Sequence, residues 1–166
     1  MKLISLLEKL EYTCLQGSTD QEVKNVIYDS RKVEEGSLFI CIRGAVVDGH
    51  KFVPDVVAKG AKVLIVEEAV EAPEDVTVIL VKDTRYAMAF ISAAYFGYPA
   101  EKLKTIGITG TKGKTTTTYM VKSILENAGY KVGLIGTIEA IIGDKVIPAK
   151  NTTPESYVIQ EYFHEM

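Results

Sequence analysis

Short apolar runs alternate with helical patterns through the first hundred residues. Near the start, leucines recur every three or four positions, a spacing that places one face of a helix in a core; they are Leu3, Leu6, Leu7 and Leu10. Apolar runs of strand length follow at 24–28, 38–42, 63–67 and 76–81. Helical patterns at 52–59 and 84–98 end near Gly60 and Gly97. This alternation predicts an α/β domain with a partly parallel sheet.

The pattern is interrupted by a polar break at residues 100–102, which predicts a domain boundary between residues 1–99 and 100–166. Beyond it, apolar runs predict strands at 104–109 and 131–136, and helical spacing predicts a helix at 114–128. A hairpin is predicted around Gly143-Asp144, and a last helix is predicted to start near Pro154. A nucleotide-binding sheet usually has about four to six strands. We therefore expect an N-terminal fragment of a longer protein, with its second domain truncated.

Composition restricts the possible partners. The chain has 166 residues, 47% hydrophobic and 25% charged, as is usual for a globular protein, and its net charge of -3 gives no reason to expect nucleic acid. No apolar run reaches the roughly 18 residues of a membrane span, and Glu8 and Lys9 interrupt any signal-peptide pattern. Cys14 and Cys41 lie far apart, which favours a reduced, cytoplasmic setting without structural zinc.

The most specific chemistry lies in the run Gly110-Thr111-Lys112-Gly113-Lys114-Thr115-Thr116. Its glycines let the backbone approach oxyanions, and N–H groups at a helix start bind phosphates. Lys114 can reach the β- and γ-phosphates, and the Thr115 hydroxyl can ligate Mg2+. Ile108 stands where the usual G-x-x-x-x-G-K-[ST] motif has its first glycine. A chance turn before a helix is the weaker alternative, because four successive threonines are poor helix formers.

Four motifs in order resemble those of the Mur ligase family, over nearly the whole chain. Asp29-Ser30-Arg31 and the following Gly36-Ser37-Leu38-Phe39 resemble the family's D-S-R…G-x-L-F signature, and residues 44–52, with Asp48-Gly49-His50, resemble its G-x-x-x-D-G-H-x-F segment. The phosphate loop is similar to G-T-N-G-K-T-T-T, with Lys112 in place of asparagine. Asn151-Thr152-Thr153-Pro154 resembles the N-T-T-P element that distinguishes the MurE branch from the MurF branch.

The resemblance implies an ATP-dependent, amide-forming ligase of peptidoglycan synthesis. In the MurE branch such an enzyme adds the third amino acid to UDP-MurNAc-L-Ala-D-Glu through an acyl phosphate. The implied cofactors are ATP and Mg2+, and the implied partners are the UDP-MurNAc-dipeptide and a free amino acid, bound by a cytoplasmic monomer. Residues 1–99 would bind the UDP end, residues 100–166 would begin the ATP-binding central domain, and the C-terminal domain that selects the amino acid would be absent. The fragment alone is expected to be inactive.

The resemblance also implies roles for individual residues. Lys114 would be catalytic, residues 110–116 would bind ATP, and Thr115 would hold the metal. The implied ligands of the UDP-substrate are Ser30, Ala45, Val46, Val47, Asn151, Thr152 and Thr153.

Plainer alternatives stay open for several of these residues. Ser30 also suits turn capping, and Arg31 could pair with Asp29 as well as clamp a phosphate. His50 is expected to be structural, because its segment lies in the substrate-binding domain, away from phosphoryl transfer.

Alternatives also stay open for the N-T-T-P segment and for the function. Thr152 or Thr153 before Pro154 suits a helix N-cap. At the level of function, the alternatives are a MurF-type or related ligase and a non-catalytic module that binds a UDP-sugar or nucleotide.

Overall fold

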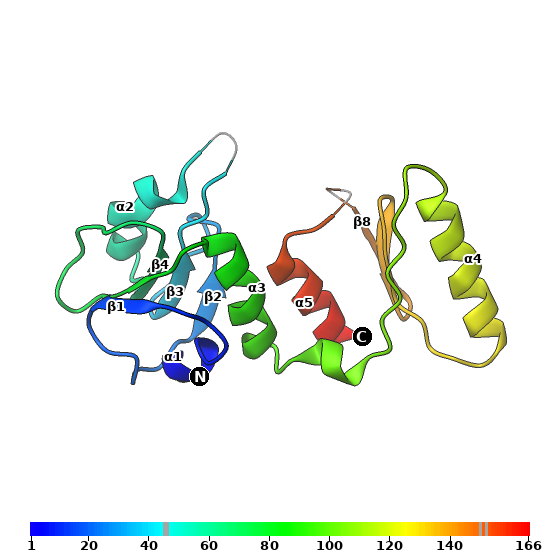
Figure 1. The fold of residues 1–166 in the computed structure, drawn as a ribbon, viewed down its shortest axis with the longest axis horizontal. Coiled ribbons are helices and arrows are strands. Elements are labelled where there is room, and N and C mark those ends of the chain that lie inside the picture. Colours follow the sequence, from blue (N-terminus) through cyan, green and yellow to red (C-terminus); the bar gives the residue numbers. More distant parts are fainter. Residues whose placement is uncertain (45–46, 150, 152) are drawn as a thin grey trace. The chain divides into compact units, whose positions relative to one another are not determined.

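The computed structural model describes residues 1–44, 47–149, 151 and 153–166 (Figure 1). The chain divides into two compact units, Met1–Tyr95 and Phe96–Met166. Ala45, Val46 and Thr152, three of the predicted substrate ligands, lie outside the described residues. The domain boundary at residues 100–102 stays a prediction.

A five-stranded sheet forms the first unit, in the order β1-β5-β4-β3-β2. Its strands are β1 (Thr13–Gln16), β2 (Asn25–Ile27), β3 (Ser37–Ile40), β4 (Val63–Val66) and β5 (Thr77–Leu80). Neighbours from β2 to β5 are parallel, and β1 joins β5 antiparallel. The partly parallel sheet and its four predicted strands are confirmed. β1 was not predicted, because this edge strand is mostly exposed and carries no continuous apolar run.

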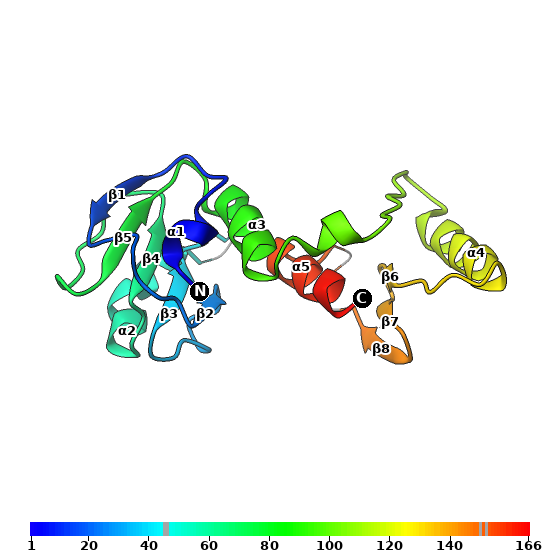
Figure 2. The ribbon, with the colours of Figure 1, turned by 90° about the horizontal axis from the view of Figure 1, so that it is seen from below.

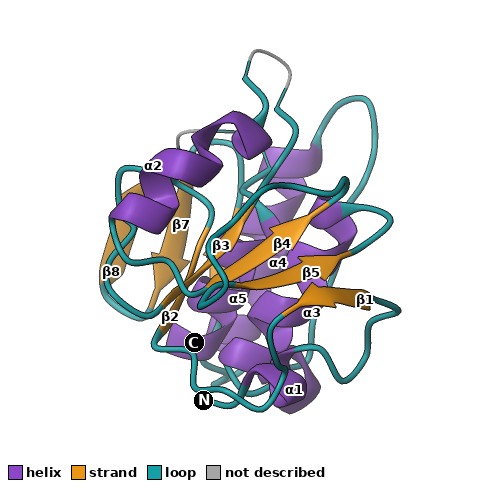
Figure 3. Ribbon diagram, turned by 90° about the vertical axis from the view of Figure 1, so that its left-hand side faces the viewer, coloured by secondary structure: helices purple, strands orange, loops and turns teal. Residues whose placement is uncertain are grey.

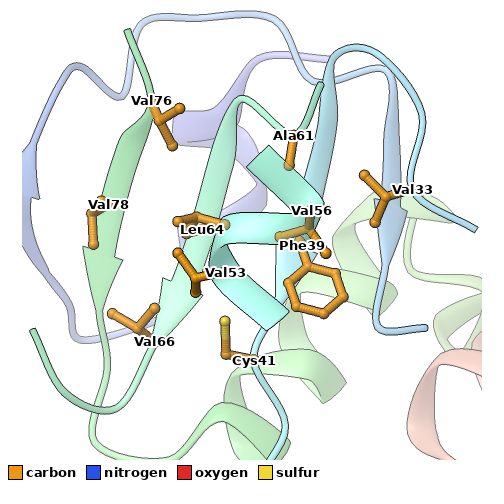
Figure 4. Packing of buried hydrophobic residues seen from close by; sticks show 10 residues of the cluster. All are labelled: Val33, Phe39, Cys41, Val53, Val56, Ala61, Leu64, Val66, Val76 and Val78. Carbon is orange, nitrogen blue, oxygen red and sulfur yellow. The ribbon is translucent and has the colours of Figure 1, made fainter. Parts of the chain in front are cut away.

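Helices cover both faces of this sheet. The helix α2 (Val53–Ala58) lies on one face, and α1 (Leu3–Leu6) and α3 (Thr84–Tyr95) lie on the other (Figure 3). Side chains alternate between the faces of a strand, so Phe39 and Leu64 pack beneath α2 against Val53 and Val56 (Figure 4). All four residues of β4 are buried, which explains its uninterrupted apolar run.

The predicted N-terminal helix is confirmed in type but is shorter than predicted. Leu3, Leu6 and Leu7 are buried as the spacing indicates, but the helix ends at Leu6 and Leu10 is only half-buried.

A three-stranded antiparallel sheet, β6-β7-β8, forms the second unit with its helices (Figure 2). Its elements are the 3-10 helix η2 (Pro99–Lys102), α4 (Lys114–Asn127), β6 (Leu134–Ile135), β7 (Glu139–Ile142), β8 (Lys145–Pro148) and α5 (Ser156–Glu165). The predicted hairpin is confirmed, with Gly143-Asp144 as the turn between β7 and β8. Among the described residues, no helix is long and apolar enough to cross a bilayer.

The strand predicted at 104–109 is wrong. Residues 104–110 belong to no helix or strand, and no described segment pairs with them. Ile106 is 63% exposed as a result. An apolar run becomes a strand only where a neighbouring backbone accepts and donates its hydrogen bonds. For the same reason the predicted strand at 131–136 is reduced to the two residues of β6.

Replacing Leu64 by alanine tests the core beneath α2. The side chain is fully buried, so Leu64→Ala should lower the free energy of unfolding of the first unit by about 2–5 kcal/mol. Urea denaturation followed through amide NMR signals of residues in this unit measures the change. The control Leu15→Ala, at a side chain 44% exposed, should change it by less than about 1 kcal/mol. Equal effects of the two substitutions would contradict this account of the core.

Candidate functional site

The carboxyl ends of the parallel strands define one edge of the first unit. Ser30 follows β2, residues 41–48 follow β3, and Glu67 follows β4. Because these strands are parallel neighbours, the segments that follow them lie at the same edge. This edge is where open α/β sheets bind ligands.

The turn after β2 is organised by an ion pair. Arg31 donates from Nε and Nη2 to the two oxygens of Asp29, at 2.8 and 2.7 Å, and its backbone N–H donates to Oδ1 at 3.1 Å. These hydrogen bonds lower the pKa of Asp29 to about 2. Of the two alternatives for Arg31, the structure therefore shows pairing with Asp29.

Ser30 itself is half-buried in this turn. Lys59, just after α2, donates from Nζ to the Ser30 carbonyl at 2.8 Å. Among the described residues, no hydrogen bond engages the Ser30 hydroxyl, so turn capping by this side chain is not observed and the hydroxyl can bind a ligand.

Hydrogen bonds join the two described sides of the loop that follows β3. Arg43 and Asp48 form an isolated antiparallel bridge, and Gly44 N–H donates to the Val47 carbonyl at 2.9 Å. Gly49 closes the base by donating to Ile42 O at 2.9 Å. A Cβ on Gly49 would lie 2.7 Å from Ile42 N, so only glycine allows this close approach. Val47, a predicted substrate ligand, is 48% exposed on the loop.

His50 ties the base of this loop to the end of β4. Its Nδ1 lies 2.6 Å from Asp48 Oδ1, and its Nε2 accepts the backbone N–H of Glu67 at 2.9 Å. Because Nε2 accepts, the ring proton lies on Nδ1 and is donated to Asp48. The hydrogen bonds from His50 hold the pKa of Asp48 below its usual value. With its ring buried and both nitrogens engaged, His50 has the structural role expected from the sequence.

The end of β4 also holds the start of α3. The Glu67 carboxylate accepts hydrogen bonds from the Thr84 N–H at 2.8 Å and the Thr84 hydroxyl at 2.7 Å. The same hydroxyl lies 3.1 Å from the Cys41 carbonyl.

Burial raises the pKa of the Cys41 thiol to about 12, so this thiol stays protonated.

Side chains with ligating atoms gather at Asp48, His50 and Glu68, within 4.8 Å of one another. A metal is not favoured there, because both imidazole nitrogens are already engaged and Glu68 pairs with Arg43. Instead, His50 acts as a clamp, because its hydrogen bonds to Asp48 and to the Glu67 N–H join the loop after β3 to the end of β4.

The phosphate loop lies in the second unit and leads into α4. Gly113 is the residue before the helix and has a φ of +79°, a backbone conformation that favours glycine. A Cβ at this position would touch nothing within 4 Å, so the backbone of Gly113 is open to a ligand. Lys114 Nζ donates to the Gly110 carbonyl at 2.7 Å, which holds the ammonium over the loop.

A pocket of about 450 Å³ opens at this loop. It is lined by Thr111, Lys112, Gly113, Lys114, Thr115, Thr116 and Thr137. Six of these are predicted ATP-binding residues, and the structure brings them to one cavity. Thr137 was not predicted. It follows the run 131–136, and its place just after a predicted strand is the signal that could have found it.

Asn151 and Thr153 are exposed between β8 and α5. The residue that precedes α5 is Glu155, and its side chain makes no capping hydrogen bond to the helix start. The N-cap role is therefore wrong for Thr153, because the helix begins two residues later than Pro154. Both residues keep their predicted substrate role as a prediction.

Two family models match the chain. The "Mur ligase family, catalytic domain" matches residues 22–96, and the "Mur ligase middle domain" matches residues 108–166. The chain belongs to the Mur ligase family. The family predicted from the four motifs is thereby confirmed.

Two curated relatives of this Mur ligase chain are named UDP-N-acetylmuramoyl-L-alanyl-D-glutamate--2,6-diaminopimelate ligase. The Clostridium perfringens protein is 53% identical over 166 residues, and the Clostridium tetani protein is 48% identical over 169 residues. Both alignments cover the whole chain but only 34% and 35% of the relatives. The chain thus spans about a third of the length of these proteins.

Solved Mur ligases share the fold. MurF from Acinetobacter baumannii matches with a TM-score of 0.64 and 27% identity, over 99% of this chain and 33% of that one. A structure titled as a UDP-N-acetylmuramoyl-L-alanyl-D-glutamate--2,6-diaminopimelate ligase matches with a TM-score of 0.75 and 22% identity, over 99% and 33%. The MurF ligase of Thermotoga maritima, solved with ADP, matches with a TM-score of 0.55 and 22% identity, over 85% and 29%. The predicted fold class is confirmed by these similarities.

Replacing His50 tests the clamp. His50→Ala removes two hydrogen bonds and leaves Asp48 and the Glu67 N–H without this partner, so the free energy of unfolding of the first unit should fall by about 2–4 kcal/mol. Urea denaturation measures it. The exposed neighbour Lys51 supplies the control, and Lys51→Ala should stay within about 0.5 kcal/mol of the parent. A similar value for His50→Ala would contradict the clamp.

The Asp29–Arg31 pair predicts a pH effect. The pKa of Asp29 is lowered by folding, so its contribution to stability is present above the ordinary carboxyl pKa, near 4, and is lost as the pH falls through about 2. Asp29→Asn should therefore destabilise the protein at pH 7, and the difference from the parent should shrink steadily below pH 4. Denaturation at several pH values measures this difference. A constant difference for Asp29→Asn would refute the assignment.

Proposed function

We propose that this chain supplies the substrate-binding and ATP-binding parts of a ligase that joins 2,6-diaminopimelate to UDP-MurNAc-L-Ala-D-Glu during peptidoglycan synthesis. The observation that carries the proposal is the Mur ligase phosphate loop, formed at the start of α4 with its glycine, lysine and threonine in place. The names of the relatives supply the amino acid, which the sequence did not identify.

ATP fits the phosphate loop. Its pocket is lined by lysines, threonines and a glycine, without an acidic side chain among them. Lys114 supplies positive charge for the β- and γ-phosphates, and backbone N–H groups between Thr111 and Thr116 donate to phosphate oxygens at the positive end of the helix. Bound ATP supplies the phosphoryl group that activates a carboxylate for amide formation. Lys114 accordingly takes the catalytic role in this proposal.

Mg2+ fits the same pocket through Thr115. Its side chain is half-buried at the first turn of α4. The hydroxyl oxygen is a hard ligand of the kind that Mg2+ takes beside phosphates.

The UDP end of the substrate fits the carboxyl edge of the sheet in the first unit. Ser30 offers a free hydroxyl, and Lys59 places an ammonium at the Ser30 carbonyl. Val47 offers apolar surface on the loop after β3, where Ala45 and Val46 are predicted to contribute as well.

The proposal also assigns roles to the segment before α5 and to the two domains. Asn151, Thr152 and Thr153 bind the muramoyl-peptide portion. Residues 1–99 act as the UDP-substrate domain and residues 100–166 as part of the ATP-binding domain of a cytoplasmic monomer.

A MurF-type ligase is the second candidate, because the Acinetobacter baumannii MurF structure matches at 27% identity. The two candidates differ in their carboxylate substrate. The gene product that contains this chain should release phosphate from ATP with UDP-MurNAc-dipeptide and 2,6-diaminopimelate. Turnover with UDP-MurNAc-tripeptide instead would favour the MurF-type enzyme, and no nucleotide turnover with either would favour a binding module.

Lys114→Ala in that gene product tests the phosphate loop. Loss of the ammonium should lower kcat/KM for ATP by at least about 100-fold, because a charge that stabilises the transferring phosphoryl group is removed. A phosphate-release assay measures it. Lys131→Ala, at an exposed lysine outside the pocket, is the matched control and should keep full activity. Full activity of Lys114→Ala would refute the proposal.

A further inference from the structure

Among the described residues that line the phosphate pocket, Thr137 alone comes from another part of the chain. The other six form the continuous run 111–116. Thr137 follows the whole of α4 and β6 in sequence and lies in the turn between β6 and β7. The fold of the second unit, rather than local sequence, therefore brings it to the pocket.

The backbone on both sides of Thr137 is fixed by hydrogen bonds. Gly136 N–H donates to the Glu139 carbonyl at 3.0 Å, which closes the turn around Thr137. Ala149 N–H donates to the Ile138 carbonyl at 2.9 Å and joins the turn to the end of β8. Thr137 itself is exposed. The turn thus presents a solvent-facing hydroxyl on a fixed backbone.

A second contact fixes this turn relative to the phosphate loop. The Tyr119 hydroxyl, on the second turn of α4, donates to Glu139 Oε1 at 2.6 Å. This hydrogen bond raises the pKa of Tyr119. The loop enters α4 at Lys114, and Glu139 lies two residues after Thr137. The tyrosine therefore ties the helix that carries the loop to the strand that follows the turn.

The chemistry of the pocket favours an anion beside Thr137. Lys112 and Lys114 supply positive charge, and no acidic side chain is among the lining residues. A threonine hydroxyl can donate to a phosphate oxygen. Among the described residues, no hydrogen bond occupies the Thr137 hydroxyl.

We infer that the Thr137 hydroxyl hydrogen-bonds a phosphate oxygen of the nucleotide held by residues 111–116. This inference rests on the proposed function and adds to it a binding residue outside the phosphate-loop motif. The expected effect of Thr137 is on nucleotide binding and not on binding of the UDP-substrate.

The test uses the gene product that contains this chain, with Thr137→Val, Thr137→Ser and a matched control, Thr117→Val. Valine keeps the shape of threonine and removes the hydroxyl, and serine keeps the hydroxyl. Thr117 is exposed on α4 and is not among the residues that line the pocket. The Kd for ATP is measured by calorimetry, KM for ATP and for the UDP-MurNAc-dipeptide by phosphate release, and Tm by circular dichroism.

Thr137→Val should raise the Kd and KM for ATP about 10- to 100-fold, as expected for a lost hydrogen bond to a charged group. KM for the UDP-MurNAc-dipeptide and Tm should stay unchanged. Thr137→Ser should restore ATP affinity to within about 3-fold, and Thr117→Val should match the parent.

Two results would overturn the inference while leaving the proposed function intact. One is an unchanged Kd for ATP in Thr137→Val. The other is a weakened Thr137→Ser that matches Thr137→Val, which would assign the effect to shape instead of the hydroxyl. If the parent protein binds no ATP at all, the proposed function fails first and the inference falls with it.

Discussion

The parallel pairing of β2, β3, β4 and β5 is the constraint on which the first unit depends. It buries β4 on both faces and requires a crossover on the sheet between β3 and β4, which α2 supplies. It also turns the carboxyl ends of four strands toward one edge. Ser30 and the loop ending at Asp48 are distant in sequence, and this pairing makes them neighbours along that edge.

Hydrogen bonds at the end of β4 stabilise the segments that meet at that edge. The backbone N–H of Glu67 binds His50, and its carboxylate binds Thr84. One residue therefore connects the loop after β3, the end of β4 and the start of α3. Val47, a predicted substrate ligand, directly precedes Asp48, whose carboxylate is hydrogen-bonded to His50. Preorganisation of this kind reduces the entropy lost when a ligand binds.

The backbone of the phosphate loop in the second unit depends on local conformation. A glycine with positive φ and the first turn of a helix are local features, and both form here although residues 104–109 pair with no described strand. The lining of the pocket also includes Thr137, which the β6–β7 turn supplies. The backbone of the loop therefore depends on neighbouring residues in the sequence, whereas the lining of its pocket also depends on a residue distant in the sequence.

Elements with local signals were predictable from the amino-acid sequence. The apolar runs predicted β2 to β5, glycines marked helix ends and the hairpin turn, and the motif order predicted the Mur ligase family. Side-chain chemistry likewise predicted Lys114 and Thr115 in one phosphate site.

The folded structure settled several features for which the sequence pattern left alternatives open. Residues 104–109 have the composition of a strand, but strand formation requires a neighbouring backbone that composition does not report. Arg31 could have bound a phosphate or a carboxylate, and the proximity of Asp29 in the folded turn decided for the carboxylate. His50 became structural because the end of β4 places the Glu67 N–H at its second nitrogen. Each of these outcomes depends on which groups lie within hydrogen-bonding distance, and that distance is set by the packing of the whole unit.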